Sequence, residues 1–278
     1  MNLIVEAGTT KTDAVLINTD GSILIQTAST GINPVSDPDY QHAIDDLVMT
    51  YRNRAIQQIF YYGSGCINEE VNEGVANRLR KGLQQEPYIE IADDLLGVAR
   101  GLCQRIPGIA SILGTGSNIG YYDGKSIIDG IKSGGYLIGD EGSGFKIGQS
   151  IYSKFARGQL SSELSEKITQ EYGVKQEDAV GQLYQQTNPR QHLASFAKAI
   201  NWFEGTTKRE IMTEVFNSYV NAMVLPIHKK YPVPVHIVGS IGVHFKEYLI
   251  PIFEKFNILA ASIERSPLDG LIRYHSNE

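Results

Sequence analysis

The chain begins the same pattern twice. Residues 3–28 and 109–130 each pass from an apolar run through a loop of glycine and hydroxyl residues into a second apolar run, an Asp-Gly turn and a third apolar run. The loops are "EAGTTKT" and "ILGTGSN". Asp-Gly between apolar runs is a strong hairpin signal. We therefore predict two similar halves, each opening with antiparallel strands, in a duplicated α/β domain.

The rest of the first half alternates strands with helices. Apolar spacing predicts strands over 56–62 and 88–92, and helices over 40–51, 69–83 and 95–105, with Asn68 as the N-cap of the second helix. This alternation is typical of an α/β layer.

The second half is richer in helix. We expect helices near 159–172, 176–186, 190–203, 207–229 and 243–256, strands over 233–238 and 259–264, and a closing helix that starts at Ser266-Pro267. The predicted domains are 1–106 plus 265–278, and 107–264 with helical additions.

Composition narrows the class of protein. The chain has 278 residues and a net charge of -6, which argues against a nucleic-acid binder because phosphate backbones select basic faces. No apolar run reaches the roughly 18 residues that span a membrane, and the N-terminus lacks the features of a signal peptide. Cys66 and Cys103 are too few for a disulfide framework, and the six histidines show no zinc spacing. We expect a cytoplasmic protein with two structural cysteines.

Residues 114–126 resemble two familiar nucleotide-binding motifs but match neither of them. The sequence "GTGSNIG" resembles a dinucleotide fingerprint, but that fingerprint leads directly into a helix, and here a strand follows. The sequence "GYYDGKS" ends like a P-loop, but one residue too few separates its glycines. What remains is a hairpin whose backbone N–H groups and hydroxyls can hold an anion. One such hairpin is more often a plain turn, whereas a pair of them favours a phosphate clamp in an interdomain cleft.

Three further loops carry candidate ligand groups. Asp140 and Glu141 in "GDEGSG" are either helix caps or a site for a sugar hydroxyl or Mg²⁺, and the surrounding glycines favour the site. Asp93 and Asp94 follow a strand, where one carboxylate could accept a proton from a substrate hydroxyl, or could cap the next helix. The loop "VGSIG" at 238–242 is either a tight turn or a wall for a nucleoside.

Taken together, these motifs resemble a known family. The sequences "VEAGTTKTDAVL", "TGINPV", "YYGSGC", "IADDLLGVARGL", "GIASILGTGSN", "GGYLIGDEGSGFKIG", "HIVGSIG" and "SPLDGLIRYH" are similar to those of N-acetylglucosamine kinases, next to the benzoyl-CoA-reductase-activator type of ATPases. The resemblance implies the superfamily of sugar kinases, actin and heat-shock chaperone ATPases. Its fold is α/β, with two ribonuclease-H-like domains around a cleft that binds ATP and sugar.

The resemblance also implies roles for individual residues. Asp94 in "DLLG" would be the general base on the sugar 6-hydroxyl. The implied sugar contacts are Asn33, Asp94, Gly134, Gly135 and Asp140. The implied nucleotide contacts are Gly8, Thr9, Thr10, Lys11, Gly114, Thr115, Gly116, Ser117, Ser195, Gly239 and Ser240. Mg²⁺ would be held through the phosphates, with Glu6 as a candidate ligand.

The chain departs from the superfamily in its first loop. Glu6 stands where Asp is usual, as it also does in N-acetylglucosamine kinases, and Thr9 replaces a common Gly or Ser. Cys66 and Cys103 lack the spacing of the iron–sulfur cluster found in the activator ATPases.

The resemblance predicts an ATP-dependent amino-sugar kinase that acts on the 6-hydroxyl of N-acetylglucosamine. The alternatives are an N-acetylmuramic acid or glucosamine kinase, or a nucleotide-dependent ATPase or sensor without sugar turnover. We expect ATP and Mg²⁺ as cofactors, a small amino sugar as ligand, and neither nucleic acid nor membrane as partner. A homodimer is compatible with this expectation.

Overall fold

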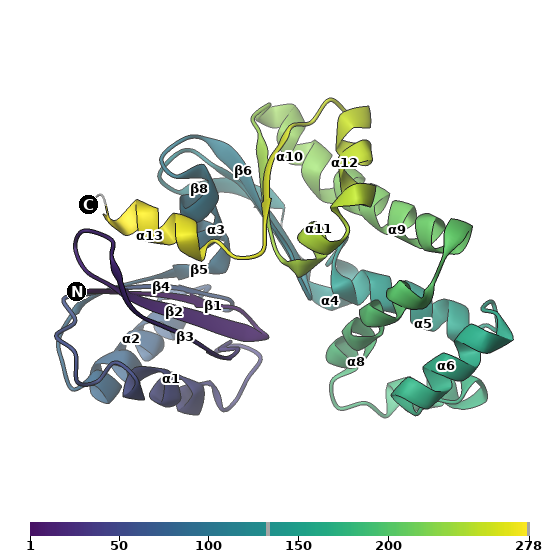
Figure 1. Ribbon diagram of the computed structural model, residues 1–278, viewed down its shortest axis with the longest axis horizontal. Coiled ribbons are helices and arrows are strands. Elements are labelled where there is room, and N and C mark those ends of the chain that lie inside the picture. Colours follow the sequence, from purple (N-terminus) through teal and green to yellow (C-terminus); the bar gives the residue numbers. More distant parts are fainter. Residues whose placement is uncertain (132–133, 277–278) are drawn as a thin grey trace. The chain divides into compact units, whose positions relative to one another are not determined.

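The computed structural model describes residues 1–131 and 134–276 and contains two five-stranded sheets, shown in Figure 1. The first sheet has the order β3-β2-β1-β4-β5. Its strands are β1 (Asn2–Ala7), β2 (Lys11–Ile17), β3 (Ile23–Thr30), β4 (Gln58–Gly63) and β5 (Tyr88–Asp93). Strands β1, β2 and β3 pair antiparallel, whereas β4 is parallel to both β1 and β5. The predicted opening hairpin is therefore confirmed.

Helices cover both faces of this sheet. Leu3 and Val5 of β1 pack with α1 (Tyr40–Met49) and α2 (Glu69–Leu83), whereas Ile4 packs on the opposite face with α13 (Leu268–Ser276). This alternation follows from the two-residue period of a strand. Helix α3 (Asp94–Cys103) packs against α13, and Gly270 allows their backbones to approach closely, since an added Cβ would lie 1.9 Å from the Gly101 carbonyl oxygen.

The second sheet has the order β10-β9-β6-β7-β8. Its strands are β6 (Gly108–Leu113), β7 (Ser117–Tyr122), β8 (Ile127–Ile131), β9 (Val235–Val238) and β10 (Ala260–Glu264). The three consecutive strands β6, β7 and β8 lie side by side, as the repeated pattern predicts.

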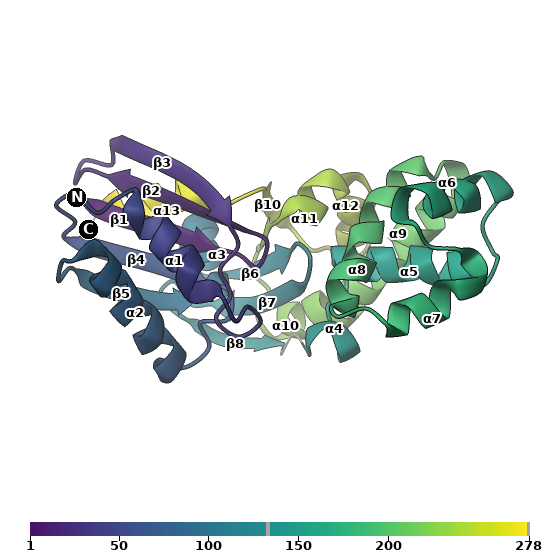
Figure 2. The same cartoon turned by 90° about the horizontal axis from the view of Figure 1, so that it is seen from below.

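The helices of the second half contain more breaks than predicted. They are α4 (Gly135–Ile138), α5 (Gly144–Ala156), α6 (Ser162–Tyr172), α7 (Ala179–Tyr184), α8 (Pro189–Ser195), α9 (Gly205–Tyr219), α10 (Leu225–Lys230), α11 (Ser240–His244) and α12 (Lys246–Lys255). The predicted helix over 207–229 is interrupted by a π-helical turn at Val220–Val224, and a 3₁₀ segment at Phe196–Trp202 follows α8. Figure 2 shows α8 beside α5, which it contacts.

Internal contacts divide the chain into two compact units. Unit 1 is Met1–Ala110, Tyr121–Ile128 and Ser266–Glu278, and unit 2 is Ser111–Gly120 and Asp129–Arg265. The outer end of the β7–β8 hairpin thus groups with unit 1, and the domain limits predicted from the sequence stay a prediction. Within residues 1–131 and 134–276, no helix is both long enough and apolar enough to cross a membrane. Cys66 and Cys103 are buried, free thiols.

Candidate active site

The parallel strands of unit 1 bring three loops to one edge of the sheet. Ala7 pairs with Gly63, and Gly63 pairs with Asp93, so β1, β4 and β5 end side by side. The next residue along each strand is Gly8, Ser64 or Asp94, and ligands of α/β sheets usually bind beyond such strand ends. The structure therefore places the first glycine loop and the predicted base at the same edge.

The first loop is a tight hairpin. The N–H of Gly8 donates to the carbonyl of Lys11 at 2.9 Å, which leaves Thr9 and Thr10 exposed at the tip. The chain at Gly31 runs directly against this tip, because a Cβ there would lie 2.2 Å from the Thr9 carbonyl oxygen. Lys11 pairs with Asp13 at 2.7 Å, so its ammonium group already has a carboxylate partner. The nucleotide contacts expected of this loop stay predictions.

Asn33 and Ser64 meet at this hairpin. Nδ2 of Asn33 donates to Oγ of Ser64 at 3.2 Å and lies 3.5 Å from Oγ1 of Thr9. Oγ of Ser64 lies 3.2 Å from Oγ1 of Thr9. Asn33 was expected as a sugar contact, whereas Ser64 is missing from the residues that the sequence singled out. The sequence feature that could have identified Ser64 is its position in "GSG", directly after a buried strand.

The two aspartates where β5 meets α3 have different surroundings. Asp93 caps α3, because its carboxylate accepts the N–H of Leu96 at 2.7 Å. Asp94 is the first residue of α3, and burial together with the nearby charge of Asp93 raises its pKa to about 6. The helix cap is therefore Asp93, and the role of Asp94 as general base stays a prediction.

The carboxylate of Glu6 lies near those of Asp94 and Asp13. Burial, Asp13 and Asp94 raise the pKa of Glu6 to about 7, whereas Lys11 lowers it. Like charges in a partly buried place disfavour one another's ionisation. The carboxylates of this edge therefore form a region where a cation would be stabilised.

In unit 2 the second glycine loop is also a hairpin, and it is held against a helix. The N–H of Gly114 donates to the Gly116 carbonyl at 3.0 Å. The carbonyls of Gly114 and Thr115 accept the N–H groups of Gly144 and Phe145, at 2.9 and 3.1 Å, at the start of α5. The loop is thus anchored through its carbonyls.

Asp140 links this hairpin to its neighbours. Its carboxylate accepts the N–H of Ser117 at 3.1 Å and pairs with Arg190 of α8 at 3.1 Å, and its side chain is buried. Asp140 adopts a φ of 61°, which aspartate tolerates better than most residues. A sugar contact for Asp140 stays a prediction. In the structure this carboxylate links the second hairpin to α8.

The remaining predicted residues of unit 2 lie on several elements. Gly134 and Gly135 are exposed at the start of α4, with φ values of 65° and 62°. Ser240 begins α11 and follows Gly239. A Cβ added at Gly239 would lie 2.2 Å from the Leu113 carbonyl oxygen, so the "VGS" loop packs closely on the strand that leads into the second hairpin. Ser195 ends α8, where its hydroxyl donates to the His192 carbonyl at 2.7 Å. Their ligand contacts stay predictions.

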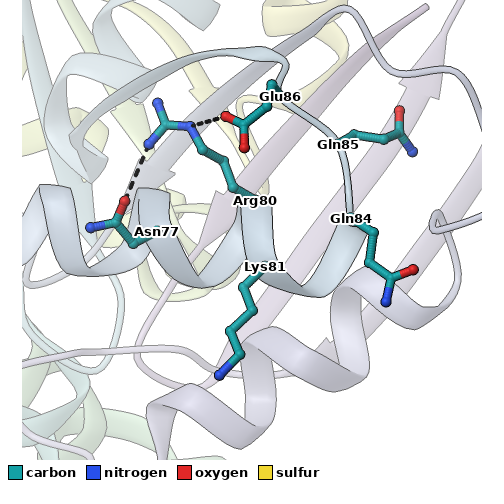
Figure 3. A pocket seen from close by; sticks show the side chains of 6 residues that line it. All are labelled: Asn77, Arg80, Lys81, Gln84, Gln85 and Glu86. Atoms are coloured by element: carbon teal, nitrogen blue, oxygen red, sulfur yellow. Dashed lines mark hydrogen bonds and ion pairs between the residues drawn. The ribbon is translucent and has the colours of Figure 1, made fainter.

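A surface pocket of about 410 Å³ lies at the C-terminal end of α2. Figure 3 shows the side chains that line it. Arg80 crosses it, pairing with Glu86 at 3.6 Å and donating to Asn77 at 3.4 Å. This end of α2 leads into the first residues of β5, at the edge of the sheet opposite Asp94. The pocket is therefore separate from the candidate site.

Comparison with known proteins identifies the family. No family model matches the chain, and no curated protein matches it. Among solved structures, the putative N-acetylglucosamine kinase from Porphyromonas gingivalis is 32% identical, with a TM-score of 0.92 over 100% of this chain and 99% of that one. The chain belongs to the N-acetylglucosamine kinase-like family. The family suspected from the motifs is thus confirmed.

More distant members of this fold agree with that assignment. The putative N-acetylglucosamine kinase from Chromobacterium violaceum is 19% identical, with a TM-score of 0.73 over 99% of this chain and 98% of that one. A ROK family glucokinase from Streptomyces griseus, solved with glucose and AMPPNP, is 12% identical, with a TM-score of 0.60 over 99% and 97%. At these identities the likeness concerns the fold alone, and it confirms the two-domain, actin-like α/β class for this kinase-like chain.

Proposed function

We propose that the chain is an ATP-dependent amino-sugar kinase that phosphorylates the 6-hydroxyl of N-acetylglucosamine. The observation that carries the proposal is Asp94, a carboxylate with a pKa of about 6 that follows a parallel strand, beside the exposed hairpin of unit 1. A base with a pKa near the working pH is ionised and can still accept a proton. Membership of the family supplies the substrate class.

In the proposed reaction, Asp94 accepts the proton of the sugar hydroxyl. The hydroxyl oxygen forms a bond to the γ-phosphorus of ATP, and the bond from that phosphorus to the β–γ bridging oxygen breaks, which releases ADP. Positioning and charge stabilisation supply most of the acceleration in such transfers. Thr10 and Thr115 lie on the two hairpin loops and would hold the phosphates through hydroxyl and backbone donors. Thr9, whose hydroxyl lies 3.2 Å from that of Ser64, would do so through its backbone N–H.

Magnesium fits the chemistry of the unit 1 edge. Mg²⁺ prefers oxygen ligands and usually takes one or two carboxylates together with substrate phosphates. The part of the chain that the structure describes holds no group of three or more His, Cys, Asp or Glu side chains that could bind a metal ion alone. Glu6, with its raised pKa, is the carboxylate we expect to share the ion with the phosphates, where the ion would neutralise charge on the transferred group. The cytoplasmic location and the homodimer expected from the sequence stay predictions.

A coupled assay of ADP release tests the proposal. The purified chain is given ATP and Mg²⁺ with N-acetylglucosamine, its 6-deoxy analogue, N-acetylmuramic acid, glucosamine or no sugar. Release with N-acetylglucosamine, and none with the 6-deoxy analogue, supports the proposal. Faster release with N-acetylmuramic acid or glucosamine would move the specificity to that sugar, and equal release without sugar would make the chain an ATPase.

A further inference from the structure

Ser64 has a fixed place at the edge that carries Asp94. It directly follows β4, and its backbone N–H donates to the carbonyl of Ala7 at 2.8 Å, which continues the pairing of β1 with β4 by one residue. The backbone of Ser64 is therefore as well defined as the sheet itself. Its side chain can serve as a rigid reference point for the loops around it.

The glycine that follows Ser64 makes room for Asn33. Gly65 has a φ of 87°, and a Cβ there would lie 2.5 Å from Oδ1 of Asn33. The "GSG" sequence thus allows the loop of Asn33 to approach the hydroxyl of Ser64.

The orientation of Asn33 is fixed from its other end. Its Oδ1 accepts the N–H groups of Val35 and Ser36, at 3.0 and 3.1 Å. Its Nδ2 is therefore turned toward Ser64 and Thr9, and it can only donate. One lone pair of the Ser64 hydroxyl accepts from Asn33, and Thr9, at 3.2 Å, can supply a second donor. When Thr9 is the donor of this contact, the single hydroxyl proton of Ser64 is directed to the carboxylate of Asp94, which follows the neighbouring strand and with which Ser64 shares a side-chain hydrogen bond.

We infer that Ser64 is a positioning residue for the phosphoryl transfer. Its hydroxyl proton is donated to the carboxylate of Asp94 and orients it, and its hydroxyl oxygen accepts hydrogen bonds from Thr9 and Asn33. The inference rests on the proposed function for the role of Asp94. One side chain on the sheet then sets three parts of the site: the base, the first hairpin loop and the loop of Asn33. A hydrogen bond to a charged group contributes more than one between neutral groups, which is why this contact should be visible in turnover.

Replacement of Ser64 tests the inference in the sugar-dependent assay. Ser64→Ala should lower kcat by about 10- to 100-fold, the range expected when a hydrogen bond to a charged group is lost. Ser64→Thr keeps the hydroxyl and should recover most of that loss. Ser29→Ala is the matched control, because within residues 1–131 and 134–276 the hydroxyl of Ser29 hydrogen bonds only to the Thr30 carbonyl, at 3.4 Å, on β3. Loss of activity in Ser64→Thr equal to that in Ser64→Ala would overturn the inference.

Two readouts separate positioning of Asp94 from a general structural effect. In an Asp94→Asn background, Ser64→Ala should change the residual kcat by less than about threefold, because residues that act as a unit are not additive. The same loss as in the wild-type background would overturn the inference. In the Ser64→Ala single variant, the acidic limb of kcat/KM should move to higher pH, because the lost hydrogen bond favours the ionised carboxylate.

A measurement without turnover keeps this inference distinct from the proposed function. Carbon NMR of the Asp94 carboxyl, with Asp94→Asn for assignment, should show a higher pKa in Ser64→Ala than in the wild type. An unchanged pKa would overturn the contact even in an active kinase. A raised pKa in a chain that phosphorylates no sugar would keep the contact and refute the proposed function.

Discussion

The carboxylate of Asp140 accepts the backbone N–H of Ser117 at 3.1 Å, and so joins the acidic "GDEGS" loop to the glycine hairpin of unit 2. The same carboxylate pairs with Arg190 at 3.1 Å. Both partners depend on a carboxylate that is almost completely buried. This cluster therefore determines the shape of the second hairpin from within unit 2.

Asp140→Ala should destabilise the chain by roughly 2–4 kcal/mol, because it leaves the Ser117 N–H and the Arg190 charge without their acceptor. Asp140→Asn keeps one acceptor oxygen and tolerates the φ of 61°, so its loss should be smaller. Urea denaturation measures both. Glu177→Ala, an exposed position on the same unit, serves as control, and wild-type stability in Asp140→Ala would refute the role of the cluster.

Asp94→Asn should lower turnover by about 10²- to 10⁴-fold, the usual loss for a general base. The amide keeps the shape of the side chain, so the variant should still bind sugar. Turnover and sugar affinity, the latter by calorimetry, check both parts. Near-normal turnover would remove Asp94 from the role of base.

The pH dependence of kcat/KM should report the same carboxylate. Because the pKa of Asp94 is about 6, activity should fall as the pH is lowered through about 6 and the base becomes protonated. Asp93→Asn removes the nearby charge that raises this pKa, so the acidic limb should move to lower pH, while the amide oxygen can still cap α3. A limb that stays in place in Asp93→Asn would argue against this coupling.

Ionisation of the partly buried Glu6 carboxyl should lower the free energy of unfolding at high pH. Its pKa of about 7 in the folded chain lies above the ordinary 4.5, so the folded state holds this proton more tightly than the unfolded state. Glu6→Gln should therefore raise the free energy of unfolding above pH 7, by at most about 3 kcal/mol, since one pKa unit corresponds to about 1.4 kcal/mol. This gain should shrink as the pH falls through 7 and vanish below about 4.5. Glu86→Gln, at an exposed position, should show no such trend in thermal unfolding.

Thr115→Val tests the second hairpin as a phosphate loop. The change keeps the shape of the side chain and the bond from the Phe145 N–H to the Thr115 carbonyl, but it removes the hydroxyl. Turnover should fall and the apparent KM for ATP should rise, each by about tenfold, as expected for one lost hydrogen bond. Unchanged values of both would make the loop a plain turn.

Much of the architecture was predictable because its signals are local. The Asp-Gly turns between apolar runs predicted the opening strands of both sheets, and Asn68 was predicted as the cap of α2, where its side chain accepts the Val71 N–H at 2.9 Å. The breaks in the helices were missed. The π-helical turn at Val220–Val224 places Met223 against Ser117, at 3.5 Å between Sδ and Oγ, and no local pattern predicts such a contact.

The sequence by itself determined the family, the α/β class, the two glycine hairpins and Asp94 as the candidate base, because motifs and periodicity lie within short stretches of chain. Only the tertiary structure showed that Ser64 meets Thr9, 55 positions away, and Asn33, 31 positions away, at the edge that carries Asp94. It also showed that Arg190 donates a hydrogen bond to the carboxylate of Asp140, 50 positions away. These meetings depend on strand register and helix packing, which bring together residues that share no local pattern.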